Sequence, residues 1–347
     1  MQLNDLGRQA APPVPRGRLA PSPTGALHLG NARTFLLAWL SIRSRGGSLV
    51  LRVEDLDHPK VKPGAAEQAI EDLRWLGLDW DEGPDCGGPF APYVQTSRTA
   101  LYKAALETLR DAGRVYPCVC SRHDVEQAQS APHRSRFRSL GYEGKCRGRF
   151  RSWRDACAAL PPGRAPVWRF RSEPGETAFT DVFAGLHAQD NAVLGDFAIA
   201  RDEHGAGYQL ACVVDDAAMR ITEVVRGDDL MEATHAQLAL QRALSLPSPA
   251  YFHVPLVVAP DGHRLAKRHG DTRLCALRAC GVAPELVCGL LAWWSGMAGF
   301  GEKIAPRDLL QRYEMSKIPH RAAVLDEKAW QYLKVDPKIT ENPGVPA

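Results

Sequence analysis

Residues 17–33 read GRLAPSPTGALHLGNAR, and this stretch decides the fold that the rest of the chain completes. A short apolar strand runs into a turn rich in proline and glycine, and His28 then opens a helix. We expect the turn to place the imidazole and free backbone N–H groups at the positive end of that helix. Such an end is a binding site for a phosphate chain.

The residues around this stretch alternate between helical and strand patterns. The spacing predicts helices over 30–45, 63–76, about 97–111, about 230–244 and 282–295, and buried strands over 48–53 and 253–259. The pattern breaks at 118–165 and resumes at about 166–171 and 196–201, followed by apolar stretches at 208–214 and 220–226. This alternation indicates an α/β fold with a doubly wound parallel sheet, in which ligands bind where strands end. Residues 17–33 and Glu54 lie at two such ends.

The composition is that of a soluble globular protein, with 45% hydrophobic and 24% charged residues and a net charge of +3. A transmembrane helix needs about 18 apolar residues in a row, and no such run occurs. The N-terminus lacks the apolar segment of a signal peptide. The nine cysteines have no disulfide-framework spacing, which indicates the reducing cytoplasm. Residues 134–154 are rich in basic side chains and contain a single acid, Glu143, so this stretch could contact an RNA backbone. Its basic residues are Arg134, Arg136, Arg138, Lys145, Arg147, Arg149, Arg151 and Arg154.

A second basic motif follows the strand predicted at 253–259. Residues 260–262 (PDG) predict a turn, and the chain then reads HRLAKRHG over 263–270. Together the two motifs resemble the signatures of class I aminoacyl-tRNA synthetases in their glutamyl form: His-x-Gly-His, with Asn31 at its last position, and Lys-Leu-Ser-Lys-Arg-His-Gly. Arg264 stands at the first lysine and preserves its charge. Ala266 replaces the usual serine and removes a hydroxyl group.

The resemblance implies catalytic roles for His28, Asn31 and Lys267. The lysine would neutralise charge that develops on the ATP phosphates, because electrostatic stabilisation is the main aid to phosphoryl chemistry. The implied ATP site, with Mg²⁺ bound to the nucleotide, comprises His28, Gly30, Asn31, Arg264, Leu265, Ala266, Lys267 and Arg268.

A pocket for glutamate needs cations for two carboxylates and an anion for the ammonium group. Residues 52–57 (RVEDLD), Tyr208 with 213–216 (VVDD), and 226–229 (RGDD) resemble blocks of the glutamyl family. By this match Glu54 meets the ammonium group, whereas Arg18, Tyr208 and Arg226 share the two carboxylates in an order that the sequence leaves open. The implied glutamate site comprises Arg18, Leu19, Ala20, Pro21, Ser22, Glu54, Tyr208 and Arg226.

Cys118, Cys120 and Cys146 have a spacing that suits a metal. Zinc prefers four tetrahedral ligands, mostly thiolates and imidazoles, so the residues alone suggest His123 or His133 as the fourth. The glutamyl-queuosine branch of the family has Cys-x-Cys followed by Tyr-x-x-x-Cys, and the resemblance therefore implies Tyr142 as the fourth ligand of one structural Zn²⁺. Three reduced thiols without a metal are the alternative. A metal would fix an insert that has little apolar content and hold the basic stretch against RNA.

We expect six segments. They are a flexible tail (1–15), the first half of a Rossmann-type catalytic core (16–117), a zinc-binding insert (118–165), the second half of the core (166–260), the second-signature loop with a short helical stem-contact segment (261–335), and a frayed tail (336–347). We expect the stretch after Lys267 to be too short for the anticodon-binding part of a full glutamyl-tRNA synthetase. The resemblance, over about residues 17–335, is therefore to the truncated glutamyl-Q tRNA(Asp) synthetases.

That branch implies a reaction in two steps. Glutamate and ATP give glutamyl-adenylate, and the glutamate then passes to the cyclopentenediol of queuosine at the wobble position of tRNA(Asp), without charging of the tRNA 3′ end. The resemblance also implies a cytoplasmic monomer without an obligate protein partner or a membrane. Three alternatives stay open: a minimal glutamyl-tRNA synthetase for tRNA(Glu), a non-catalytic RNA-binding relative, and an ATP-dependent module for another acid such as glutamine or aspartate.

Overall fold

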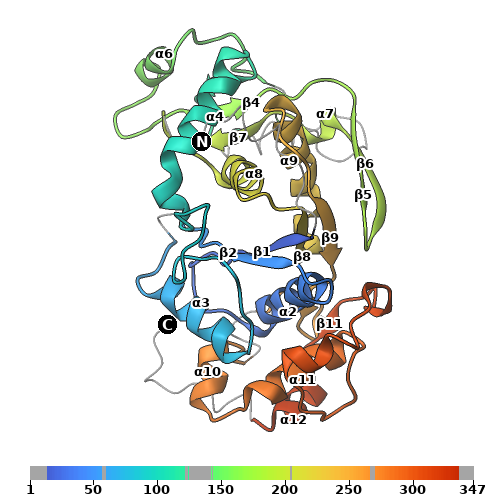
Figure 1. Cartoon of the computed structure of the whole chain (residues 1–347). Helices are drawn as coiled ribbons and strands as arrows, with labels where there is room; N and C mark the ends of the chain where they lie inside the picture. Colours follow the sequence, from blue (N-terminus) through green and yellow to red (C-terminus); the bar gives the residue numbers. More distant parts are fainter. Residues whose placement is uncertain are drawn as a thin grey trace.

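The computed structural model describes residues 14–56, 60–121, 124, 142, 144–203, 205–265 and 270–335 (Figure 1). Its strands are β1 (Arg16–Leu19), β2 (Ser48–Leu51), β3 (Val115–Cys118), β4 (Val167–Phe170), β5 (Glu176–Asp181), β6 (Gly185–Asp190), β7 (Phe197–Ala200), β8 (Glu223–Gly227), β9 (Ala250–Val254), β10 (Val257–Val258) and β11 (Ala323–Val324). The α-helices are α2 (Leu29–Arg43), α3 (Ala65–Trp75), α4 (Thr99–Asp111), α6 (Trp153–Ala158), α7 (Asn191–Leu194), α8 (Tyr208–Ala218), α9 (Met231–Ala243), α10 (Leu274–Ala279), α11 (Pro284–Trp294) and α12 (Glu327–Leu333). Short 3₁₀ turns are η1 (Gln95–Arg98), η2 (Asp228–Leu230), η4 (Pro306–Leu309) and η5 (Met315–Lys317).

Parallel strands form the centre of the molecule. β1 pairs with β2, with Arg16 opposite Ser48, and β8 pairs with β9, with Glu223 opposite Ala250. β1 and β8 lie side by side, and the backbone N–H of Thr222, the residue before β8, donates to the carbonyl of Arg16 in β1 at 2.9 Å. Figure 1 shows α4, α8 and α9 on one side of these strands and α2, α3 and α11 on the other. The predicted α/β core with parallel strands and helices on both sides is confirmed here.

Helix α2 is the element that joins the core together. Leu36, Leu37 and Leu40 are fully buried in the main hydrophobic cluster, where the helix packs against β1, β8 and α11. The helix ends at Arg43, shortly before the glycine pair 46–47 that was predicted to stop it, and Gly46 takes a left-handed conformation that other residues rarely adopt. Its N-terminus therefore lies in a fixed place beside the ends of the parallel strands.

Part of the second half of the chain differs from the expectation of a parallel sheet. β4 and β7 pair antiparallel with each other, and β4 also pairs antiparallel with β3. β5 and β6 form a separate antiparallel hairpin. Alternating strands and helices are typical of parallel sheets, but the strand pattern itself is the same in both arrangements. The strands predicted at 166–171 and 196–201 are β4 and β7, and they form a sheet with β3 rather than extending the central parallel strands.

The predicted strand over 253–259 is broken into β9 and β10. Pro255 has no backbone N–H for a strand ladder, so the two strands pair with different partners. β10 pairs in parallel with β11, with Val257 opposite Ala323. α11 packs against α2 and α12, and Trp330 of α12 joins the main core. The described part of the segment after the second signature thus packs onto the main hydrophobic core. In the described part of the chain, no helix is both long and apolar enough to span a membrane.

Candidate functional site

The turns after β1 and β2 are bonded to each other at the ends of their strands. The N–H of Arg52 donates to the carbonyl of Leu19 at 2.9 Å, and the N–H of Glu54 donates to the carbonyl of Pro21 at 3.0 Å. Leu19 is fully buried, so only its backbone is available to a ligand. In the same turn, Ala20 is half-buried and the side chain of Ser22 is exposed. Two predicted segments of the glutamate site therefore meet.

A network of buried charges lies next to these turns. Arg52 is fully buried and binds Glu54 through Nη2 at 2.9 Å and Asp216 through Nη1 at 2.7 Å. Burial alone would lower the pKa of Arg52, but Asp216 and Glu54 hold it well above its usual range. Arg18 lies 3.7 Å from Asp216, and its buried Nε–H has no hydrogen-bond partner in the described part of the chain. That unpartnered donor would be satisfied by an anionic ligand, because buried donors are nearly always hydrogen-bonded.

Tyr208 and Arg226 complete this group from the far half of the chain. Tyr208 is the first residue of α8, and burial raises its pKa well above the usual value while the nearby Arg226 and Arg18 oppose that shift. The negative charge of Glu54 also raises the pKa of the Tyr208 hydroxyl group. Arg226 lies near the end of β8 and is 5% exposed. Two buried arginines, a phenol and a carboxylate thus gather at the strand ends, an arrangement that suits an amino acid with an acidic side chain.

His28 caps helix α2 with its own ring. Its Nδ1 accepts hydrogen bonds from the N–H groups of Gly30 at 3.0 Å and Asn31 at 3.3 Å, and the Asn31 side chain accepts from the N–H of His28 at 3.2 Å. A side chain at position 30 would place its Cβ 2.9 Å from Cε1 of this ring, so the close approach requires glycine. The expectation of free N–H groups at this helix end is wrong, because the imidazole occupies them.

This cap fixes which ring nitrogen of His28 carries the proton. Nδ1 accepts two hydrogen bonds and is therefore unprotonated, so the N–H lies on Nε2. Burial lowers the pKa of His28, which favours the neutral ring. The group that His28 offers to a ligand is thus a single Nε2–H donor.

The second signature lies beside the first. Residues 260–262 form the predicted turn, in which Gly262 N donates to Ala259 O at 2.9 Å. Arg264 forms an ion pair with Asp229, directly after β8. Leu265 packs on the main core. Beyond the loop, the N–H of Leu29 donates to the carbonyl of Thr272 at 3.0 Å, so the chain returns to the N-terminus of α2. Ala266, Lys267 and Arg268 lie outside the described residues, between these two anchors.

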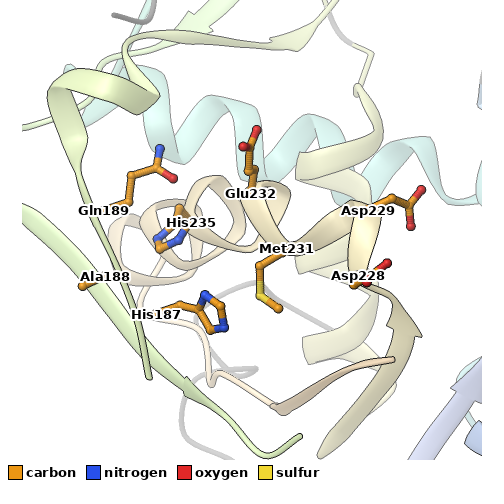
Figure 2. Close-up of a pocket in the computed structure, with 8 residues that line it drawn as sticks. All are labelled: His187, Ala188, Gln189, Asp228, Asp229, Met231, Glu232 and His235. Atoms are coloured by element: carbon orange, nitrogen blue, oxygen red, sulfur yellow. The ribbon is translucent and has the colours of Figure 1, made fainter. Parts of the chain in front are cut away.

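A cavity of about 530 Å³ opens beside the end of β8 (Figure 2). Burial and the neighbouring Asp229 raise the pKa of Asp228 at its rim. The lining carries three carboxylates and two imidazoles, which favours cationic or hydroxyl-bearing groups; it consists of His187, Ala188, Gln189, Asp228, Asp229, Met231, Glu232 and His235. Because Asp229 also binds Arg264, the cavity borders the second-signature loop.

The sulfur atoms of Cys118, Cys120 and Cys146 lie within 4.8 Å of one another. The hydroxyl group of Tyr142 lies 3.4 Å from the Cys118 sulfur and 3.2 Å from the Cys120 sulfur. Arg169 donates its Nε–H to the Cys118 sulfur at 3.2 Å. Three thiols and a phenol at these distances, with a cation beside them, form a donor set that fits a tetrahedral metal. The other suggested ligands, His123 and His133, lie outside the described residues.

Acid–base properties differ among the groups of this cluster. Burial and the neighbouring thiols raise the pKa of Tyr142 well above its usual value, and burial raises the pKa of Cys120 to about 11. Burial also opposes ionisation of Cys146, but the hydrogen bond from Tyr142 holds the pKa of that thiol below its usual value. Among the predicted RNA-facing cations, Arg147 is already paired with the buried Asp196.

Several residues of the site were not singled out from the sequence. Arg52, Asp215 and Asp216 lie inside the blocks that the sequence analysis quoted, so their acid–base pattern was a usable signal. His253 contacts Arg226 directly, and Asp181 contacts His253. Neither residue carried such a signal in the sequence. They lie far apart in the chain and outside every motif.

Comparisons with known proteins agree with this geometry. Residues 15–329 match the family described as tRNA synthetases class I (E and Q), catalytic domain. A protein of Symbiobacterium thermophilum named glutamyl-Q tRNA(Asp) synthetase is 50% identical over 303 residues, which are 87% of this chain and 93% of that protein. A protein of the same name from Nitratidesulfovibrio vulgaris is 45% identical, over 89% of this chain and 95% of its own length.

A solved structure is also similar. The crystal structure of a glutamate-tRNA synthetase from Elizabethkingia anophelis matches with a TM-score of 0.77 at 26% identity. The match covers 92% of this chain and 70% of that one.

Proposed function

Because the chain belongs to the class I tRNA synthetases of the glutamate and glutamine group, we propose that it activates glutamate with ATP and transfers it to the cyclopentenediol of queuosine in tRNA(Asp). The observation that carries the proposal is the buried group of Arg18, Glu54, Tyr208 and Arg226 at the strand ends. It offers two cations to two carboxylates and an anion to one ammonium group. The close relatives that span nearly the same length and bear the queuosine-specific name support the choice of acceptor.

In the first step the α-carboxylate of glutamate attacks the α-phosphorus of ATP, and the bond to the bridging oxygen breaks to release pyrophosphate. Arg18 and Arg226 would orient the amino acid, and Glu54 would hold its ammonium group. The Nε2–H of His28 would donate to a phosphate oxygen, and Lys267 would neutralise the charge that develops on the phosphates. Mg²⁺ bound to ATP would supply further positive charge. Such fixed charges stabilise the transition state more than they would in water, because they need no reorganisation.

In the second step a hydroxyl group of the cyclopentenediol attacks the activated carbonyl of glutamyl-adenylate, and AMP and a proton leave. No protein nucleophile is needed, since the acyl group is already activated and positioning supplies most of the rate. The protein must therefore hold the adenylate and the nucleoside in register.

The transfer of radiolabelled glutamate tests this function. We expect alkali-labile label on tRNA(Asp) that carries queuosine, and none on the same tRNA without queuosine or on tRNA(Glu). Label on tRNA(Glu) would instead show a minimal charging enzyme. An absence of both labelled RNA and glutamate-dependent ATP–pyrophosphate exchange would favour a non-catalytic protein, and exchange with glutamine or aspartate would show a different amino-acid substrate.

We propose further that Cys118, Cys120, Tyr142 and Cys146 hold one structural zinc ion. The bound ion would cross-link β3 with the residues near 142–146, where the described chain offers only a small apolar cluster. The ion would then fix the segment that carries Lys145, Arg149 and the other exposed cations for RNA.

The variant Cys118→Ser tests the metal site. We expect it to lose most of the bound zinc and to lower the thermal midpoint by roughly 5 °C, because a structural metal contributes directly to folding. Tyr142→Phe should have a smaller effect, since three thiolates remain. Cys157→Ser is the matched control, because Cys157 is exposed and lies outside the cluster. Wild-type protein that contains no zinc by elemental analysis, purified without chelators, would refute the site.

A further inference from the structure

We propose that His253 and Asp181 are positioning residues for glutamate: together they hold the guanidinium group of Arg226 in the orientation that receives a substrate carboxylate. The proposal rests on the proposed function, in which Arg226 contacts glutamate. It adds a specific dependence of glutamate affinity on the protonation of one buried imidazole.

Asp181, the last residue of β5, is surrounded by donors. One carboxylate oxygen accepts from the N–H groups of Phe183 at 2.9 Å and Ala184 at 2.7 Å. The other oxygen accepts from the backbone N–H of His253 at 3.0 Å and lies 2.7 Å from Nδ1 of the same residue. Burial opposes the ionised form, but the hydrogen bonds from His253 and the two backbone groups hold the pKa of Asp181 below its usual value. The carboxylate is therefore an acceptor only.

This arrangement determines the tautomer of His253. Because Asp181 can only accept, the ring must donate from Nδ1, and a neutral ring then has a lone pair on Nε2. The Nε–H of Arg226 points at that lone pair at 2.9 Å. The three residues thus form a chain of two hydrogen bonds, in which Nδ1 of His253 donates to Asp181 and Nε2 of His253 accepts from the Nε–H of Arg226.

A second contact fixes the same edge of Arg226. Nη2 donates to the hydroxyl group of Thr234 at 2.7 Å, and the guanidinium carbon lies 5.2 Å from the centre of the Tyr251 ring. The contacts to His253 and Thr234 use Nε and one hydrogen of Nη2. Nη1 and the other hydrogen of Nη2 therefore remain, among the described residues, as a two-pronged donor for a carboxylate.

The groups that face His253 come from every element packed around it. His253 is 1% exposed, and burial lowers its pKa, although the bond to Asp181 opposes the shift. The charged and titratable neighbours are Asp181 on β5, His187 on β6, Arg226 on β8, Asp228 on η2, His235 on α9 and Tyr251 on β9 itself. Arg226 and His187 disfavour the protonated ring, so it is neutral at neutral pH.

Protonation of His253 would reverse the contact with Arg226. Nε2 would become a donor that faces another donor, and a second positive charge would lie next to the guanidinium group. Arg226 would have to turn away, whereas the two carboxylates of free glutamate stay ionised to about pH 5. Because burial lowers the pKa of His253 from its ordinary value of about 6.5, we expect the KM for glutamate to rise only as the pH falls below that ordinary value.

The wild-type enzyme gives the first test, through ATP–pyrophosphate exchange at intervals from about pH 8 down to about pH 5. We expect the KM for glutamate to increase progressively toward the lower pH, by up to about tenfold once the ring is protonated, the effect of losing one hydrogen bond to a charged group, while the KM for ATP changes much less. A KM for glutamate that is constant or falls on acidification would overturn the proposal. If no glutamate-dependent exchange occurs at any pH, the proposed function fails instead.

Two amide variants separate positioning from a structural role. In His253→Gln the longer side chain places a carbonyl oxygen near the position of Nε2, accepts from Arg226 and does not titrate. In His253→Asn the shorter amide reaches Asp181 but leaves the Nε–H of Arg226 without an acceptor. We expect the glutamine variant to have a KM for glutamate near that of the wild type at about pH 8 and to be flat with pH, and the asparagine variant to have a KM about tenfold higher at every pH.

A merely structural role gives a different result. Both variants would then lower stability and kcat together, without a separate change in the KM for glutamate. Should both variants fail to fold, Thr234→Val removes the second anchor of Arg226, whose hydroxyl group also lies 3.1 Å from Nε2 of His253, and should raise the KM for glutamate. A wild-type pH profile that persists in a folded His253→Gln enzyme would also contradict the proposal.

Discussion

Replacing His28 with alanine is expected to lower the rate of glutamyl-adenylate formation by about 10²–10³-fold, the usual effect of losing one preorganised donor to a developing negative charge. The structure identifies that donor as Nε2–H, because Nδ1 is occupied by the N–H groups of Gly30 and Asn31. The same substitution removes the helix cap and should cost about 1 kcal/mol of stability. Glutamate-dependent ATP–pyrophosphate exchange measures the rate.

The variant His28→Asn distinguishes the two roles of this residue. Asparagine is a favourable N-cap and can accept from the same backbone groups, so its stability should match that of the wild type. It carries no donor at the position of Nε2 and should be as slow as the alanine variant. An asparagine variant with exchange activity within a few-fold of the wild type would show that His28 serves only as a cap.

Replacing Lys267 with alanine should also reduce exchange by about 10²–10³-fold, because it removes a cation from the phosphates of the transition state. The anchors of its loop support this expectation. Arg264 is paired with Asp229 at the end of β8, and Thr272 accepts from the first residue of α2.

Two controls define the effect of Lys267. Lys267→Arg keeps the charge and should recover part of the activity, whereas Lys317→Ala removes an exposed lysine from another surface and should be neutral. Exchange that is unchanged in Lys267→Ala would exclude the phosphate role, provided that the variant has the melting temperature of the wild type.

The sequence predicted the elements with strong local signals. Helices α2, α3, α4 and α11 lie within a few residues of their expected bounds, because apolar spacing and glycine or proline at the ends define them locally. The pairing of β4 and β7 with β3 was not predictable in the same way, since strand direction depends on partners that lie far away in the chain. Pro255 was visible in the sequence, and its effect on the strand over 253–259 could have been foreseen.

In the candidate site, too, residues within motifs could be predicted from the sequence, whereas residues that act through distant contacts could not. The resemblance named Arg18, Glu54, Tyr208 and Arg226, which the structure brings together. It did not name Arg52, which neutralises Glu54 and Asp216, or His253, which receives a hydrogen bond from Arg226. These supporting residues act through contacts across the fold, so they follow from tertiary structure rather than from motif spacing.

The position of β1 between β2 and β8 has a consequence for synthesis on the ribosome. β1 and β2 leave the exit tunnel early, but Arg16 accepts a hydrogen bond from Thr222, which is translated much later. Until then one edge of β1 has no strand beside it, and exposed strand edges pair readily with other chains. More than half of the chain must therefore be synthesised before β8 can pair beside β1. Until then, the open edge of β1 is the place where a chaperone would protect the nascent protein.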